Sequence, residues 1–240
     1  MKHHVFLSVM TSMITLCCIH GSAVAQERFR FSPETYGVVA KQSAGHPNER
    51  ARWNGIWNYS NQQYPQARKH FERAARYADK PSQFVLGMMH WHGEGGPKDP
   101  VTAYIWIDLA GERGTTAELI VLREKMWESL THEQKAQVRE RGPGFFEQFG
   151  DAVTMARTNT QIRRFSSGRT GSRTGGSPGT MSVSLGNEAA DTCATSDSPP
   201  LASLGGSDIY AACRTDPEHY WREQEHVLKE MVAGARVAGG

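Results

Sequence analysis

Residues 86–114 read LGMMHWHGEGGPKDPVTAYIWIDLAGERG, and this stretch says more about the fold than any other. Apolar and small side chains recur every three or four residues on both sides of a glycine-rich centre, which is the spacing of two amphipathic helices. No helix continues through Gly93-Glu94-Gly95-Gly96-Pro97, so this centre predicts a loop. The second helix is expected over residues 100–112, with a stop at Gly114. The stretch therefore predicts a helical hairpin.

A second unit with similar spacing lies about 32 residues earlier in the chain. In each unit a glycine is followed, after a gap of 12 or 16 residues, by four residues at steps of three, four and four. The glycine lets two antiparallel helices approach closely, the small residues let the next hairpin stack, and the aromatic residue fills the space between layers. The positions are Gly55, Ala67, His70, Ala74 and Ala78 in the first unit, and Gly87, Ala103, Trp106, Ala110 and Gly114 in the second.

The second unit resembles the Sel-one-like repeat (SLR), a member of the tetratricopeptide-like superfamily. Its departures from the repeat pattern are Ser82, His90 and Gly111, and the upstream unit looks more like a tetratricopeptide repeat. The resemblance implies an all-α fold, a short right-handed α-solenoid of helix-turn-helix repeats. The residues that carry it are Leu86, Gly87, His90, Gly93, Gly95, Asp99, Ala103, Trp106, Ala110 and Gly114.

Further helices are expected on both sides of the two repeats. Residues 36–43 are expected to add an N-terminal helix, and 116–141 a capping hairpin whose second helix begins at Thr131 with a capping box to Gln134. Gly142-Pro143-Gly144 is expected to end that hairpin. The repeat domain is thus predicted to span 26–144, with no period-two strand pattern before Met181.

The first 25 residues have the layout of a secretory signal peptide. A basic start is followed by an uncharged apolar run of 15 residues and by Ala23-Val24-Ala25, which predicts cleavage between Ala25 and Gln26. The run is shorter than the ~20 residues that span a bilayer, although an uncleaved anchoring helix is the alternative. We expect a periplasmic (Gram-negative type) or secreted protein, without stable membrane insertion after the signal is removed.

Charge and composition divide the rest of the chain. The whole chain has 27 basic and 25 acidic residues, a balance too even for a nucleic-acid-coating protein, so no nucleic-acid partner is expected. Residues 152–187 contain five arginines and no acid, and 166–187 are mostly Gly, Ser and Thr. Region 145–187 is therefore predicted to be a helix followed by a flexible basic linker. Region 188–240 is an acidic tail, with nine acidic and four basic residues.

Two cysteines remain once the signal peptide is gone. Cys193 and Cys213 predict a disulfide that closes a loop in the tail, while two unpaired thiols are the alternative. Their spacing does not match a zinc site. The tail is also expected to contain a short strand near 181–185 and a helix near 217–233, and the linker is expected to uncouple it from the repeats.

No catalytic, cofactor or metal residue is predicted. His90 and His92 lie two residues apart, so on a helix they point about 200° away from each other, and His90 occupies a core position of the repeat. His219 and His226 are seven residues apart rather than the four of a zincin motif. The sequence contains no P-loop and no Rossmann fingerprint.

The remaining candidate is a protein-binding surface on the first helix of each hairpin. Tetratricopeptide-like proteins hold peptides or partner domains on this concave face, and aromatic and methionine side chains there suit adaptable contacts. The alternative is that these side chains only pack against the neighbouring hairpin. The predicted partner-binding residues are Arg52, Ile56, Tyr59, Phe84, Met88 and Trp91.

These observations predict an exported, non-enzymatic adaptor or scaffold that binds another protein or peptide. An enzyme or metal-binding module in 145–240, positioned by the repeats, is the rival hypothesis. A structural or lectin-like role in the cell envelope is a third. The rival would gain if His219, Glu223 and His226 met in a cleft.

Overall fold

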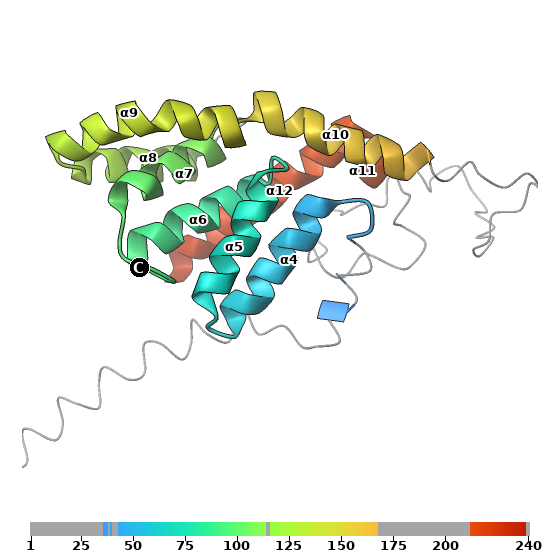
Figure 1. Cartoon of the computed structure of the whole chain (residues 1–240), viewed down its shortest axis with the longest axis horizontal. Helices are drawn as coiled ribbons and strands as arrows, with labels where there is room; N and C mark the ends of the chain where they lie inside the picture. The colour runs from blue at the N-terminus through green and yellow to red at the C-terminus, as the bar shows by residue number, and fades with distance from the viewer. Residues whose placement is uncertain (1–35, 38, 40–42, 114–115, 168–211, 239–240) are drawn as a thin grey trace, which may run out of the picture.

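The computed structural model describes residues 36–37, 39, 43–113, 116–167 and 212–238 (Figure 1). Within these ranges the regular structure is helical, with no strand, which confirms the predicted all-α class. Tyr36, Gly37 and Val39 are helical, in line with the expected N-terminal helix. The longer helices are α4 (Pro47–Ser60), α5 (Tyr64–Ala75), α6 (Lys80–His92), α7 (Pro100–Ala110), α8 (Ala117–Ser129), α9 (His132–Phe149), α10 (Asp151–Ser167) and α12 (Pro217–Ala238), and α11 (Ala212–Thr215) is a single turn.

The two repeats form the hairpins α4–α5 and α6–α7, and equivalent residues hold each pair together. A methyl group added at Gly55 would lie 2.5 Å from the Phe71 ring, and one added at Gly87 would lie 2.6 Å from the Ile107 side chain. Phe71 and Ile107 each lie four residues after the buried alanine of their repeat, so the two close approaches are the same contact in successive units. The predicted repeat register is confirmed.

Several helices begin where the sequence predicts. Asp99 accepts a hydrogen bond from the backbone N–H of Thr102 at 2.9 Å, which satisfies one of the free donors of α7. Thr131 and Gln134 form the predicted capping box at the start of α9. Proline lies in the first turn of both α6 and α7, where its missing N–H costs no helical bond.

The glycine-rich loop after α6 folds back on α5. Gly93 (φ +79°) and Gly95 (φ +80°) adopt left-handed conformations that favour glycine. A side chain at Gly95 would also lie 2.8 Å from the backbone carbonyl of Tyr64. Arg68 donates to the carbonyl of Met89 at 3.0 Å, which ties the two hairpins at this point. The predicted loop is confirmed, while Gly114 lies outside the described residues.

The expected end of the capping hairpin at 142–144 is wrong, because α9 continues to Phe149 with Pro143 inside it. Pro143 is exposed, so its ring projects into solvent rather than into a packed neighbour. Phe145 and Phe149 pack on the buried Trp106, with ring centroids 5.4 and 4.7 Å apart. This aromatic packing outweighs the local helix-breaking tendency of proline, so the boundary predicted at 144 falls inside a helix.

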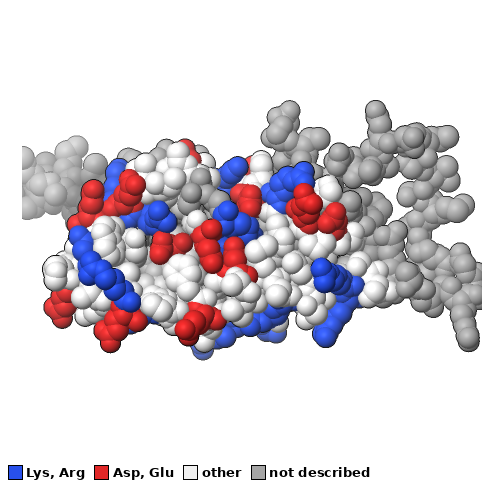
Figure 2. Space-filling view, turned by 90° about the horizontal axis from the view of Figure 1, so that it is seen from above, with Lys and Arg blue, Asp and Glu red and all other residues white. Residues whose placement is uncertain are grey.

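Helix α10 follows the short break at Gly150 and is anchored to the repeats by a cluster of charges. The Nζ of Lys80 is buried, and lies 2.7 Å from the carbonyl of Leu109 and 3.1 Å from the carboxylate of Asp151. Arg113 donates two hydrogen bonds to Asp151, at 2.8 and 3.1 Å. On the face that carries α9 and α10, basic and acidic side chains are interspersed (Figure 2).

The terminal helix predicted near 217–233 is present as α12, but it is not uncoupled from the repeats. It contacts α6 and α8, and the short helix α11 contacts α10 (Figure 1). The picture of a separate C-terminal tail is therefore wrong for 212–238. Residues 1–35, the strand expected near 181–185, and Cys193 lie outside the described residues, as does the side chain of Cys213.

Candidate partner-binding face

Helices α4 and α6, the first helices of the two hairpins, and helix α8 share a surface that we call the inner face. Helix α12 lies across it. It reaches α4 through side-chain hydrogen bonds and α6 and α8 through packing. On this face the contact has a polar half on α4 and an apolar half on α6 and α8. Beside it, Trp221 of α12 packs with Ile162 of α10 and donates to Asn159 at 2.9 Å.

The polar half is a buried hydrogen-bond network to which both α4 and the helices α11 and α12 supply charged or amide groups. Arg214 donates to both carboxylate oxygens of Glu49, at 2.8 and 3.2 Å. Arg52 donates to Gln224 at 2.8 Å, and Asn48 donates to the hydroxyl of Tyr220 at 2.7 Å. A second ion pair within the repeats, from Arg52 to Asp79 at 2.8 Å, holds the arginine in place.

Burial and the neighbouring charges shift the pKa of Glu49 in opposite directions. Desolvation favours the neutral carboxyl, but Arg214, His46 and Arg52 outweigh it and hold the pKa of Glu49 well below its usual range. The carboxylate is therefore charged at neutral pH. It is a fixed anionic site for an arginine.

The apolar half consists of two side chains of α12 inserted among side chains of the repeats. Leu228 and Val232 are almost fully buried, at 2% and 3% exposure. The residues of the repeats and of α8 that form the same cluster are Phe84, Ala103, Ile107, Ala110, Leu119 and Met126, with Met88 and Trp91 packed against them. Hydrophobic contacts therefore hold this part of α12.

The six residues predicted for the partner-binding face fall into two groups, and only one of them lies against α12. Arg52 donates to Gln224 of α12, and Phe84 lies in the apolar cluster around Leu228; both side chains are buried. Met88 and Trp91 are half-buried and pack against the same cluster. The expectation that the first helices expose Arg52 and Phe84 is therefore wrong.

Ile56 and Tyr59 form the second group. Ile56 is also buried, against the expectation, because it packs between the hairpins against Phe71 and Leu86. The hydroxyl of Tyr59 donates to Glu94 at 2.9 Å. For these two residues, packing between neighbouring hairpins is the observed role.

Two kinds of residue at the inner face were not predicted: the polar Asn48, Glu49 and Gln224, and the apolar Leu119 and Met126 of α8. Asn48, Glu49 and Gln224 resemble the solvated side of a helix, so no signal marked them. One signal was present in α12: four of the five buried residues among its described side chains, Tyr220, Gln224, Leu228 and Val232, follow one another at intervals of four, and the fifth is Trp221.

The histidines considered as ligands lie apart from one another or have other partners. His90 is half-buried, and burial, together with the nearby Arg68, lowers its pKa to about 4. His219 pairs with Asp216 at 2.9 Å, and His226 lies 3.7 Å from Glu230. The described part of the chain contains no group of three His, Cys, Asp or Glu side chains placed to hold a metal ion.

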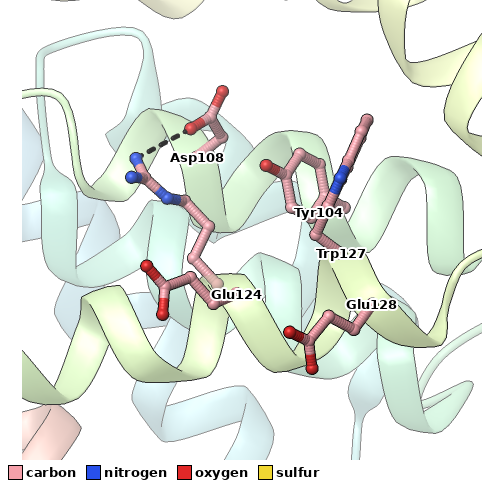
Figure 3. A pocket seen from close by; sticks show the side chains of 6 residues that line it. Tyr104, Asp108, Glu124, Trp127 and Glu128 are labelled. Carbon is pink, nitrogen blue, oxygen red and sulfur yellow. Dashed lines mark hydrogen bonds and ion pairs between the residues drawn. The ribbon is translucent and has the colours of Figure 1, made fainter.

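A hollow lies between α7 and α8, with a cavity volume of about 350 Å³. Tyr104 and Trp127 form one wall, with ring centroids 5.0 Å apart, and Arg123 pairs with Asp108 at 3.1 Å (Figure 3). Burial raises the pKa of Asp108. Glu124 and Glu128 complete the lining, and both are exposed. The hollow is open and polar, and its inner carboxylate already has an arginine partner.

None of the helices in the described ranges combines the length and hydropathy needed to cross a membrane.

Comparison with known families matches the chain to the Sel1 repeat, at residues 50–76 and 80–115. These ranges coincide with the hairpins α4–α5 and α6–α7. Repeats of this family generally mediate protein–protein interaction. Neither the curated proteins nor the solved structures yield a match.

Proposed function

We propose that this Sel1-like repeat protein, which contains two Sel1 repeats, is an exported, non-enzymatic scaffold. It binds another protein on the inner face of α4, α6 and α8. The observation that carries this proposal is the docking of α12 on that face. A surface that binds one helix through paired charges and apolar anchors has the chemistry to bind another.

The inner face offers a partner both specificity and area. Glu49 and Arg52 provide charges at fixed positions, and Phe84 provides an apolar anchoring surface one hairpin away. Charged groups at an interface select the partner and its orientation, while buried apolar groups supply most of the affinity. Both kinds of group come from the first helices of the hairpins.

The proposal of export depends on the sequence of residues 1–25. A basic start, a 15-residue uncharged apolar run and an A-x-A site are the features that support it. Binding in the periplasm or outside the cell follows from this part of the proposal.

The test compares two substitutions by glutamate at different places. Met88→Glu puts a charge beside the apolar half of the inner face, whereas Val153→Glu puts one on α10, where the side chain is 41% exposed. Each variant, and the wild type, is expressed with its own signal and an affinity tag, and proteins cross-linked to it in the periplasmic fraction are identified.

We expect a partner that is recovered with the wild type and with Val153→Glu, and at least tenfold less with Met88→Glu. Circular dichroism should show the same helix content in all three. A partner lost with Val153→Glu and kept with Met88→Glu would place binding on another surface.

A further inference from the structure

We propose that α11–α12 is an internal ligand, which occupies the inner face until an amphipathic helix of a partner protein displaces it. This inference rests on the proposed function and adds the class of partner and the way in which access is controlled. The partner helix is expected to present the same chemistry as α12.

The polar half of the contact can separate without leaving buried groups unsatisfied. Asn48, Glu49 and Arg52 all lie on the surface that α12 covers, so water can replace Tyr220 and Gln224 when the helix leaves. Interfaces that form and dissociate are more polar than permanent ones, which resemble a hydrophobic core cut in half. The α4 half has the polar character of the first kind.

The apolar half explains why the face does not remain empty. Release of α12 would uncover Phe84, Leu119 and Met126, which now surround Leu228 and Val232. Exposed apolar patches of this kind are rare on soluble proteins unless they bind something. A partner helix must therefore bring its own pair of aliphatic side chains to this position.

The spacing on α12 defines the partner's pattern. An aromatic residue, an amide and two aliphatic residues follow one another at intervals of four, at positions 220, 224, 228 and 232. Arg214 lies six residues before Tyr220 and forms an ion pair with Glu49 at 2.8 Å. The opposite side of the helix is polar, with Arg222 and Lys229 exposed. The expected partner is thus an amphipathic helix preceded by an arginine.

The probe for the test is a fluorescent peptide with the sequence of residues 212–238, added to the full chain. In the wild type the internal helix competes with the peptide. The apparent association constant of the peptide is then its intrinsic value multiplied by the fraction of molecules in which the face is open. Leu228→Asp in the full chain removes an apolar anchor from α12 and leaves the face unchanged. Lys229→Asp is the matched control, because it places the same side chain on the exposed side of the helix.

We expect the Leu228→Asp chain to bind the peptide at least tenfold more tightly than either the wild type or the Lys229→Asp chain. A peptide with Arg214→Glu should lose at least tenfold in affinity for the Leu228→Asp chain, because it would meet Glu49 with a like charge. Hydrogen exchange of the wild type provides a second measurement. Amides of α12 should exchange at least tenfold faster than those of α6 and α7, by local release.

Several outcomes would overturn the inference. Equal protection of α12, α6 and α7, or loss of repeat helicity in the Leu228→Asp chain, would make α12 a permanent part of the core. A folded Leu228→Asp chain that does not bind the peptide would exclude an internal ligand. A wild-type dimer that the peptide dissociates would show exchange of α12 between copies instead. If a partner binds through Met88 but the peptide does not compete with it, the proposed function stands and this inference fails.

Discussion

Substitution of Gly87 by alanine tests the repeat register most directly. The added Cβ would lie 2.6 Å from Cδ1 and Cγ1 of Ile107 and 3.1 Å from the carbonyl oxygen of Ala103. Because Ile107 is fully buried in a packed core, its side chain can move aside only by displacing its neighbours. Overpacking of this kind costs about 1–3 kcal/mol, and the helix propensity of alanine offsets roughly 0.5–1 kcal/mol. We expect a net loss of about 1–2 kcal/mol.

Thermal and urea unfolding, followed by circular dichroism, measure this loss. For a chain of this size, 1 kcal/mol shifts Tm by about 2–4 °C, so Gly87→Ala should lower Tm by roughly 2–8 °C. Gly144→Ala is the matched control in α9, where an added Cβ has no neighbour within 4 Å and the next residue is not proline. It should raise stability by about 0.5–1 kcal/mol, since only helix propensity changes.

A double-mutant cycle locates the clash. Ile107→Ala alone should cost about 2–5 kcal/mol, because it leaves a cavity beside Gly87. In the double variant the methyl group added at position 87 fills part of that cavity, so the combined loss should be smaller than the sum by about 1 kcal/mol or more. Additive losses, or a Gly87→Ala variant as stable as Gly144→Ala, would refute the close contact of α6 and α7.

Three further predictions concern single features of the chain. Burial lowers the pKa of His90 to about 4, so as the pH falls the unfolded chain binds this proton before the folded chain does, and stability should fall between about pH 6.5 and pH 4. In thermal unfolding, His90→Phe should flatten this pH dependence. It should also raise Tm at pH 7, because it removes a buried Nδ1 that has no hydrogen-bond partner. Protein purified from the periplasm should begin at Gln26 on N-terminal sequencing, and retention of Met1 would contradict export with cleavage. Mass spectrometry of unreduced peptides should link Cys193 to Cys213 with the loss of two hydrogens, whereas alkylation of both in the native protein would contradict the disulfide.

The hairpins could be predicted from the sequence because their signals are local. Gly87 and the alanines after it record how closely two neighbouring helices approach, and Asp99 marks the start of the second helix. Both features act over about 20 residues or fewer. The capping box of Thr131 and Gln134 is equally local, and it too is found where predicted.

The path of α9 could not be predicted in the same way. Gly142 and Pro143 are strong local stop signals, but the contact that overrides them joins Phe149 to Trp106, more than 40 residues away in the chain. Local propensity is a weak prior when tertiary contacts of this size compete with it. The error of the predicted boundary follows directly from that competition.

The inner face shows a more general limit. Asn48 and Tyr220 are 172 residues apart in sequence, and neither carries a sign of the other. The four-residue spacing of α12 predicts that the helix is buried along one side, but many surfaces could cover it. The prediction that the first helices form the binding surface named Arg52 and Phe84, which lie against α12 or its apolar cluster, but it missed the helix that covers them.

The stability of the fold and the availability of the inner face are coupled through α12. Two repeats are fewer than the three or so that a solenoid usually needs, and here helices α8 and α9, which both pack on α7, and helix α12 enlarge the buried surface. Leu228 therefore contributes both to stability and to occupancy of the face. A partner helix that supplies equivalent side chains would restore the lost burial as it displaces α12, so that exchange exposes Phe84 and Met126 only transiently. The partner's affinity must then depend on how strongly α12 is docked. Each variant that weakens α12 docking without altering α4, α6 or α8 should strengthen partner binding by the same factor by which it increases the open fraction.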